Sequence, residues 1–270
     1  MPESVVAVIG AGVMGETLLA GLVRAGRRPE DLLVGEKRRE RALELQERYG
    51  VNVVSTQEAA QRADTVVLVV KPQDMGDLLA EIAAVVRAGQ LVVSLAAGIT
   101  TAFVEARLPD GVAVVRVMPN TPALVDEGMA AISRGSHCEE SQLAEVESLM
   151  ASTGKVIRVP ERQQDAVTAI SGSGPGYIFF VVESRIEAGV HLGLPRSTAT
   201  ELVVQTVVGS AKLIRDTAEH PVVLRERVTS PGGTTAAALR KLEEHSVRAA
   251  FLVAIEAARD RSRALAEGMD

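Results

Sequence analysis

The sequence predicts an α/β protein in which residues 1–160 form a domain around a parallel sheet and residues 161–270 form an all-helical domain. Two observations support this division. Short valine-rich runs alternate with longer segments of helical period in the first part, which is typical of parallel strands joined by crossover helices. After Pro160 the strand-like runs stop, and apolar residues recur at helical spacing.

Six strands are expected in the first domain, because buried parallel strands are nearly continuous apolar runs. They span residues 4–9, 32–36, 65–70, 91–94, 113–118 and 130–133. Six helices are expected in the second domain, at residues 163–169, 175–192, 196–217, 222–228, 235–244 and 247–265. Alanine and valine occupy more than one face of these helices, so we expect the helical domain to bury surface against a second copy of the chain.

The composition argues against several classes of function. The net charge of −6 disfavours nonspecific nucleic-acid binding, which depends on a basic surface. Cys138 is the single cysteine, which excludes an intrachain disulfide, and the four histidines are scattered, so we expect no metal site. No apolar run reaches the ~18 residues that span a bilayer. We therefore expect a cytoplasmic protein with neither a nucleic-acid nor a membrane partner.

A glycine-rich turn follows the first predicted strand directly and opens a helix. Residues 10–15 have the G-x-G-x-x-G spacing of a dinucleotide-binding loop. In such a loop Gly10 makes the tight turn, Gly12 admits the phosphates, and Gly15 lets helix and strand pack closely. This pattern makes the first domain Rossmann-type. The cofactor contacts expected here are Gly10, Gly12, Val13, Met14 and Gly15.

The residues after the second predicted strand point to two different cofactors. Glu36 can accept hydrogen bonds from the ribose hydroxyls of NAD, whereas Lys37, Arg38 and Arg39 can hold the 2′-phosphate of NADP. These charges are also typical of a solvated helix start. We favour NADPH and leave NADH use open.

Two further segments follow predicted strands at the edge where a nicotinamide is expected. Val70, Lys71 and Pro72 end one strand, and Lys71 is either a cofactor contact or a surface lysine. Met118, Pro119 and Asn120 end another. Asn120 offers a donor and an acceptor to a carboxamide, but the same residues also form ordinary turns.

The helical domain contains a turn suited to a small anion. Ser230-Pro231-Gly232-Gly233 precedes a predicted helix that opens with Thr234 and Thr235. A helix N-terminus carries free N–H groups and partial positive charge, so a carboxylate or phosphate fits there. An ordinary capped turn is the alternative interpretation.

A second glycine- and serine-rich stretch precedes the first long helix of this domain. Ser173 is not a nucleophile elbow, because that motif requires glycine where Ser171 stands. We interpret Ser173 and its neighbours as a helix entrance that lines a cleft.

These motifs together resemble the pyrroline-5-carboxylate reductase family over nearly the whole chain. The matching segments are residues 10–15, 69–72, 96–99, 116–120, 171–175 and 230–235. The last two are specific to that family. Two departures are visible: Gly176 stands where alanine is usual, and Thr56 stands where we expect an asparagine that touches the adenosine ribose.

The resemblance implies reduction of 1-pyrroline-5-carboxylate to L-proline by NAD(P)H, the last step of proline biosynthesis. It implies that Ala97, Gly98 and Thr56 lie at the cofactor, and that the helical domain interleaves with a partner to form a homodimer. Five dimers often form a ring in the family. The substrate carboxylate is expected on the loop of Ser230, Gly232, Gly233, Thr234 and Thr235, supplied across the dimer interface, with Ser173 nearby.

The chemistry requires a held carboxylate and a protonated imine. We assign Thr235 the catalytic role of orienting the imine through its ring nitrogen or carboxylate. The proton comes from Tyr177, from water, or with a substrate already bound as the iminium. Two rivals stay open: a reductase of another imine or a β-hydroxy acid, and a nucleotide sensor without turnover.

Overall fold

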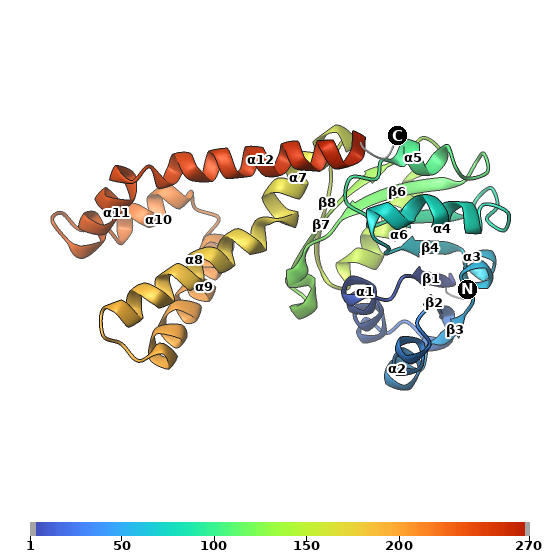
Figure 1. Cartoon of the computed structure of the whole chain (residues 1–270), viewed down its shortest axis with the longest axis horizontal. Helices are drawn as coiled ribbons and strands as arrows, with labels where there is room; N and C mark the ends of the chain where they lie inside the picture. Colours follow the sequence, from blue (N-terminus) through green and yellow to red (C-terminus); the bar gives the residue numbers. More distant parts are fainter. Residues whose placement is uncertain (1–3, 268–270) are drawn as a thin grey trace. The chain divides into compact units, whose positions relative to one another are not determined.

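The computed structural model describes residues 4–267, with side chains from 4 to 265. The chain folds into two compact units, which we call the sheet unit and the helical unit (Figure 1). The sheet unit runs to Ser173 and includes the chain from Ala258 onward, and the helical unit spans Gly174–Ala257. The domain boundary at residue 160 stays a prediction.

One eight-stranded sheet organises the sheet unit, in the order β3-β2-β1-β4-β5-β6-β7-β8. The strands are β1 Val6–Ile9, β2 Leu32–Gly35, β3 Asn52–Val54, β4 Thr65–Leu68, β5 Leu91–Ser94, β6 Ala113–Met118, β7 Gly128–Arg134 and β8 Gly154–Arg158. The first six are parallel, in the doubly wound order 3-2-1-4-5-6 of dinucleotide-binding domains. The strand order reverses between β1 and β4, so the glycine turn after β1 lies where such sheets bind ligands.

The sheet differs from the sequence prediction at three strands. β7 is antiparallel to β6, whereas we expected only parallel pairs. β3 and β8 were not expected at all. β3 has three residues with one exposed, and β8 is only partly buried, so neither forms the continuous apolar run by which the other strands are recognised.

Helices cover both faces of the sheet. They are α1 Val13–Arg24, α2 Arg39–Tyr49, α3 Thr56–Arg62, α4 Met75–Ile82, α5 Thr101–Glu105, α6 Glu140–Ala151 and α7 Gln164–Val167. Strand residues alternate between two cores: Val6 and Val8 pack with α1, α2 and α6, while Ala7 and Ile9 pack with α3, α4 and α5. Because both faces of these strands are buried, their sequences are continuously apolar.

The helical unit contains α8 Gly174–His191, α9 Arg196–Thr217, α10 Pro221–Arg227, α11 Thr234–Glu244 and most of α12 Val247–Glu267. Within residues 174–257, only Ala199 and Val203 are buried. Both lie on α9, and Ala199 faces Gly189 of α8, where an added Cβ would stand 2.9 Å from the alanine methyl. No helix among residues 4–267 is long and apolar enough to cross a membrane.

Candidate active site

The glycine loop after β1 has the geometry that a pyrophosphate requires. Gly10 has φ +91°, and a Cβ there would lie 2.5 Å from the Val69 carbonyl oxygen. A Cβ at Gly15 would lie 2.3 Å from the Gly10 carbonyl oxygen. At Gly12, by contrast, an added Cβ meets nothing within 4 Å. Packing therefore requires glycine at positions 10 and 15, where a side chain would clash with the backbone. The space at Gly12 is open to a ligand.

The start of α1 offers free N–H groups beside that space. Gly12 is the N-cap, and no side chain caps the helix. Because uncapped amides and the helix dipole favour an anion, these residues fit the pyrophosphate of a dinucleotide. Val13, 67% exposed, and half-buried Met14 follow Gly12 in this first turn.

Glu36 turns back toward the glycine loop from the end of β2. Its Oε2 accepts a hydrogen bond from Ala11 N at 3.3 Å, and its Oε1 accepts from Arg38 N at 2.9 Å and Arg38 Nε at 3.0 Å. Burial tends to raise the pKa of Glu36, but the hydrogen bonds from Arg38 and Ala11 outweigh it and hold that pKa below its usual range. The carboxylate is therefore ionised near neutrality, and its remaining lone pairs can accept from ribose hydroxyls.

Two of the three basic residues that follow Glu36 already have partners. Arg38 pairs with Glu36, and Lys37 Nζ lies 3.0 Å from Glu81 Oε2. Arg38 remains 67% exposed, so it can reorient toward a phosphate. Thr56 is buried at the start of α3, with its Cα 3.4 Å from the position of a Cβ on Gly35. Both cofactor interpretations of this segment thus rest on side chains that lie together at the end of β2.

Sequence reasoning missed Arg41, which supports the glycine loop from α2. Arg41 Nε donates to the Ala11 carbonyl oxygen at 3.1 Å, and its guanidinium pairs with Glu16 of α1. Desolvation tends to raise the pKa of Glu16, and hydrogen bonds from Arg41 and Tyr49 lower it below its usual range. Arg41 lies in a helix whose many charged residues are typical of a solvated surface, so the sequence does not indicate its contact with the loop.

The other predicted cofactor residues follow β4, β5 and β6, which are neighbours in the sheet. A Cβ on Gly10 would lie 3.1 Å from Val70 Cγ1, so the segment after β4 packs against the glycine loop. Lys71 is exposed and Pro72 begins a short 3-10 turn. Gly98 has φ +78° and is buried beside half-buried Ala97. Met118 ends β6 and precedes buried Pro119. The structure thus gathers these residues along one edge of the sheet.

Asn120 uses its side chain within the protein. Its Nδ2 donates to the carbonyl oxygen and to Oγ of Ser171, each at 3.2 Å, and its Oδ1 accepts from Met129 N at 2.8 Å. The amide that we expected to meet a carboxamide is therefore engaged in linking the loop after β6 to Ser171. This geometry favours a positioning role, and a direct cofactor contact stays a prediction.

Ser173 follows a π-helical turn at Thr168–Gly172. Ser173 N donates to the Thr168 carbonyl oxygen at 2.8 Å, and a Cβ on Gly172 would lie 2.4 Å from Met118 Cε. Such turns often occur at functional sites. The turn holds residues 171–173 against the end of β6, within the sheet unit, so Ser173 lies near predicted cofactor residues.

The predicted anion cradle lies in the helical unit at the start of α11. Gly233 is the N-cap, no side chain caps the helix, and Gly232 has φ +70°. Gly233 N donates to the Ser230 carbonyl oxygen at 3.0 Å, and a Cβ on Gly233 would lie 2.4 Å from Ser230 Oγ. Thr234 is exposed and Thr235 half-buried. No side chain caps this turn, so the first amides of α11 can receive a carboxylate, and the choice between an anion site and an ordinary turn stays a prediction.

Among residues 4–267, no group of three or more His, Cys, Asp and Glu could hold a metal ion. Cys138 is buried, and burial raises the pKa of its thiol.

Comparison with known proteins decides the family. Residues 161–265 match the model described as pyrroline-5-carboxylate reductase dimerisation, and residues 5–98 match that of NADP oxidoreductase, coenzyme F420-dependent. The chain is 46% identical over 264 residues to the pyrroline-5-carboxylate reductase of Corynebacterium melassecola, covering 96% of this chain and 98% of the relative. This chain belongs to the pyrroline-5-carboxylate reductase family.

Solved structures of the family share the whole fold. The reductase from Coxiella burnetii has a TM-score of 0.92 and 37% identity, with 97% of this chain and 98% of that chain covered. The reductase from Plasmodium falciparum, which has NADP bound, has a TM-score of 0.89 and 30% identity, with 98% and 99% covered. The predicted family and α/β fold class are thereby confirmed. The present chain is an NAD(P)H-dependent oxidoreductase of proline biosynthesis. It takes a small-molecule substrate and carries a dimerisation domain.

Proposed function

We propose that this reductase converts 1-pyrroline-5-carboxylate to L-proline, with the cofactor bound by the sheet unit and the substrate carboxylate bound by the helical unit. The start of α11, which follows Gly232 and Gly233 and has no side-chain cap, supports this assignment of the substrate site. When bound, NAD(P)H supplies the hydride for the carbon–nitrogen double bond. The other steps, which are binding, orientation and protonation, depend on the chain itself.

The sheet unit would hold the cofactor. The amides at Gly12, Val13 and Met14 would hold the pyrophosphate, while Glu36 and Arg38 would contact the adenosine ribose. The loops that follow β4, β5 and β6 would contact the nicotinamide half. The segment after β4 packs against the glycine loop and the end of β6 packs against the π-helical turn, so both would position the reacting ring.

The start of α11 would hold the substrate carboxylate. The Gly233 amide already donates to the Ser230 carbonyl oxygen, so we assign the amides of Thr234 and Thr235 as donors, each charge-assisted bond contributing roughly 1.5–3 kcal/mol. The hydroxyl of Ser230 lies beside Gly233 and would add a further donor. The Thr235 hydroxyl would then orient the imine.

Tyr177 is better explained by packing than by acid catalysis. It is half-buried on α8 and lines an apolar cavity of about 320 Å³ with Phe180, Phe251 and Ala254. We propose that the substrate binds as the iminium, which needs no acid from the protein. Protonation by water is the alternative.

The proposed function is tested by mixing the purified protein with pyrroline-5-carboxylate and either NADPH or NADH at equal concentration. We expect the absorbance of the reduced nicotinamide to fall and L-proline to form in equal amount. Cofactor binding without oxidation would contradict the proposal and would favour a sensor or a reductase of another imine.

Cofactor preference gives a prediction at Glu36. Glu36→Gln should raise the ratio of kcat/KM with NADPH to that with NADH by roughly tenfold, because a like charge near the 2′-phosphate is removed and Arg38 is released. Initial rates with each cofactor measure the ratio. Glu44→Gln, which removes a carboxylate paired with Arg41 and Arg48 on α2, is the matched control and should leave the ratio unchanged. An unchanged ratio in Glu36→Gln would contradict the role of Glu36.

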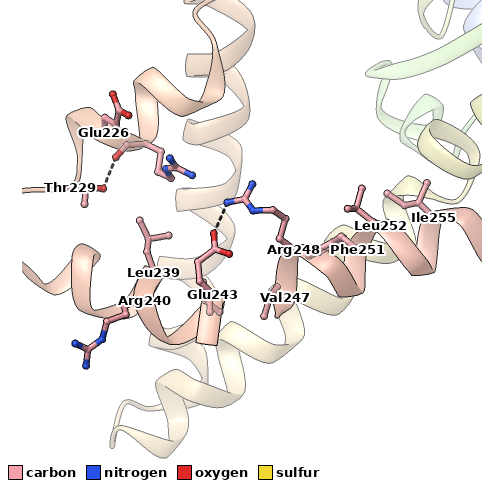
Figure 2. A pocket seen from close by; sticks show the side chains of 12 residues that line it. Glu226, Thr229, Leu239, Arg240, Glu243, Val247, Arg248, Phe251, Leu252 and Ile255 are labelled. Carbon is pink, nitrogen blue, oxygen red and sulfur yellow. Dashed lines mark hydrogen bonds and ion pairs between the residues drawn. The ribbon is translucent and has the colours of Figure 1, made fainter. Parts of the chain in front are cut away.

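The helical unit is proposed to form a homodimer. Its helices expose large apolar side chains, including Phe179, Phe180, Leu252 and Val253, each more than 60% exposed. Side chains of α10, α11 and α12 line a cavity of about 720 Å³. Figure 2 shows the pair of Arg248 and Glu243 in this cavity, together with Phe251 and Leu252. A unit with so few buried residues needs a second copy to cover it. A ring of five dimers and a cytoplasmic location stay predictions.

Leu252→Asp should therefore weaken the dimer by about 100-fold or more, because the substitution places a charge in a surface that the partner covers. Light scattering at decreasing protein concentration would report the change. Leu43→Asp, at a leucine on α2 that is 50% exposed, should leave the oligomer intact. Equal oligomer size for the two variants and the parent would speak against dimerisation through this face.

A further inference from the structure

Arg116 is a buried cation that the proposed reaction does not use directly. Its side chain is 5% exposed, and its neighbours on β6, Val115 and Val117, are buried. Its Nη1 lies 3.5 Å from Glu161 Oε1, and its Nη2 lies 4.0 Å from Asp165 Oδ1 without a hydrogen-bond partner among the described residues. Since a buried charge is costly unless it is compensated, the two carboxylates are what permits Arg116 here.

Glu161 connects this arginine to a second element. Its Oε1 accepts a hydrogen bond from Thr101 N at 2.7 Å, and its Oε2 accepts from Thr101 Oγ1 at 2.6 Å. Thr101 is the first residue of α5 and lies three positions after Gly98. One carboxylate thus ties the arginine of β6 to the helix that follows the loop of Ala97 and Gly98. We call Arg116, Glu161 and Thr101 the bracket.

The bracket joins the segments that we predict to contact the cofactor and substrate. Arg116 lies two residues before Met118 on β6, and Thr101 follows the loop after β5. Glu161 also begins the segment that leads through α7 to Ser173. Asp165 on α7 accepts a hydrogen bond from Ser262 of the returning α12 at 2.8 Å, so the same segment is held from a second side.

We propose that Glu161 is a positioning residue for hydride transfer, acting through Thr101 and Arg116, which rests on the proposed function. It fixes the loop after β5 relative to the end of β6, and both carry predicted cofactor contacts. A displacement of either loop would leave the cofactor bound but poorly aligned for reaction. Because the bracket would act through the alignment of these loops, its loss should lower kcat as well as stability.

The test compares the variants Glu161→Gln and Thr101→Val with a control variant, Glu145→Gln, which removes a carboxylate at the opposite edge of the sheet. Glu145 Oε1 accepts from Thr65 Oγ1 at 2.6 Å, where β4 begins, so Glu145→Gln removes a matched charge far from the cofactor edge. Thr101→Ser keeps the hydroxyl and serves as the conservative variant. For each protein, kcat, KM for both substrates and the unfolding temperature are measured.

We expect Glu161→Gln to lower kcat by about tenfold, Thr101→Val to lower it by less, and Thr101→Ser to restore it. Glu145→Gln should lower the unfolding temperature by as much as Glu161→Gln without changing kcat. If both bracket variants keep kcat while losing stability, the bracket is only structural and the proposal is wrong. An unmodified protein without turnover would contradict the proposed function, and this inference with it. If Glu161→Gln fails to fold, the pair Thr101→Val and Thr101→Ser still decides the outcome.

Discussion

Gly12→Asp is expected to abolish cofactor binding while leaving the fold intact. An aspartate is a good N-cap and a favourable charge at a helix N-terminus, and an added Cβ meets nothing within 4 Å. Its carboxylate would occupy the amides that the pyrophosphate needs. Losing two charge-assisted bonds of roughly 1.5–3 kcal/mol each raises the Kd for NADPH by about 100-fold to 10,000-fold.

Fluorescence titration with NADPH and thermal unfolding of the cofactor-free protein measure the two effects separately. Gly12→Ser introduces a neutral cap and should weaken binding less. Gly15→Ala is the contrasting variant: its Cβ would lie 2.3 Å from the Gly10 carbonyl oxygen, so it should lose roughly 1–3 kcal/mol of stability. A Gly12→Asp protein that binds NADPH nearly as well as the parent would place the pyrophosphate elsewhere.

Thr235→Ala should lower kcat/KM for pyrroline-5-carboxylate by about 10-fold to 100-fold, the range expected when one hydrogen bond to a charged group is lost. Its backbone amide remains, so the carboxylate can still bind, and both a raised KM and a lowered kcat are expected. Affinity for NADPH should not change, because the glycine loop lies in the other unit.

Two variants control this result. Thr235→Ser keeps the hydroxyl and should retain most activity. Thr229→Val removes a hydroxyl of the same turn that donates to the Arg225 carbonyl oxygen at 2.6 Å, and it should leave kcat/KM nearly unchanged. Loss of NADPH binding in Thr235→Ala would contradict its assignment to the substrate.

The sequence predicted the features that depend on local pattern. The glycine loop could be placed because it follows a continuous apolar strand, and the start of α11 because glycines precede a helical period. β3 and β8 were missed because short, partly exposed strands carry no such pattern. The fold class and the two candidate binding turns were therefore accessible from local order along the chain.

Side-chain partners could not be predicted, because they depend on how distant segments pack. Asn120 was expected to face the cofactor but bonds Ser171, 51 residues away. Glu36 and Arg38 were treated as rival signals, yet they form one ion pair. The bracket joins residues from β6, α5 and the segment before α7. Nothing in the spacing of Thr101, Arg116 and Glu161 along the chain indicates that they meet.

The assignment of α11 as the carboxylate site is tested most directly by comparing two substrates in two proteins. Pyrroline-5-carboxylate and 1-pyrroline, which lacks the carboxylate, are each reduced with NADPH by the unmodified reductase and by Thr235→Ala. If α11 holds the carboxylate, the unmodified protein should lose about 100-fold or more in kcat/KM on 1-pyrroline. Thr235→Ala should lose little further if its hydroxyl contacts the carboxylate, and about 10-fold further if it contacts the ring nitrogen. Equal use of both substrates by the unmodified reductase would contradict the assignment of α11 as the carboxylate site.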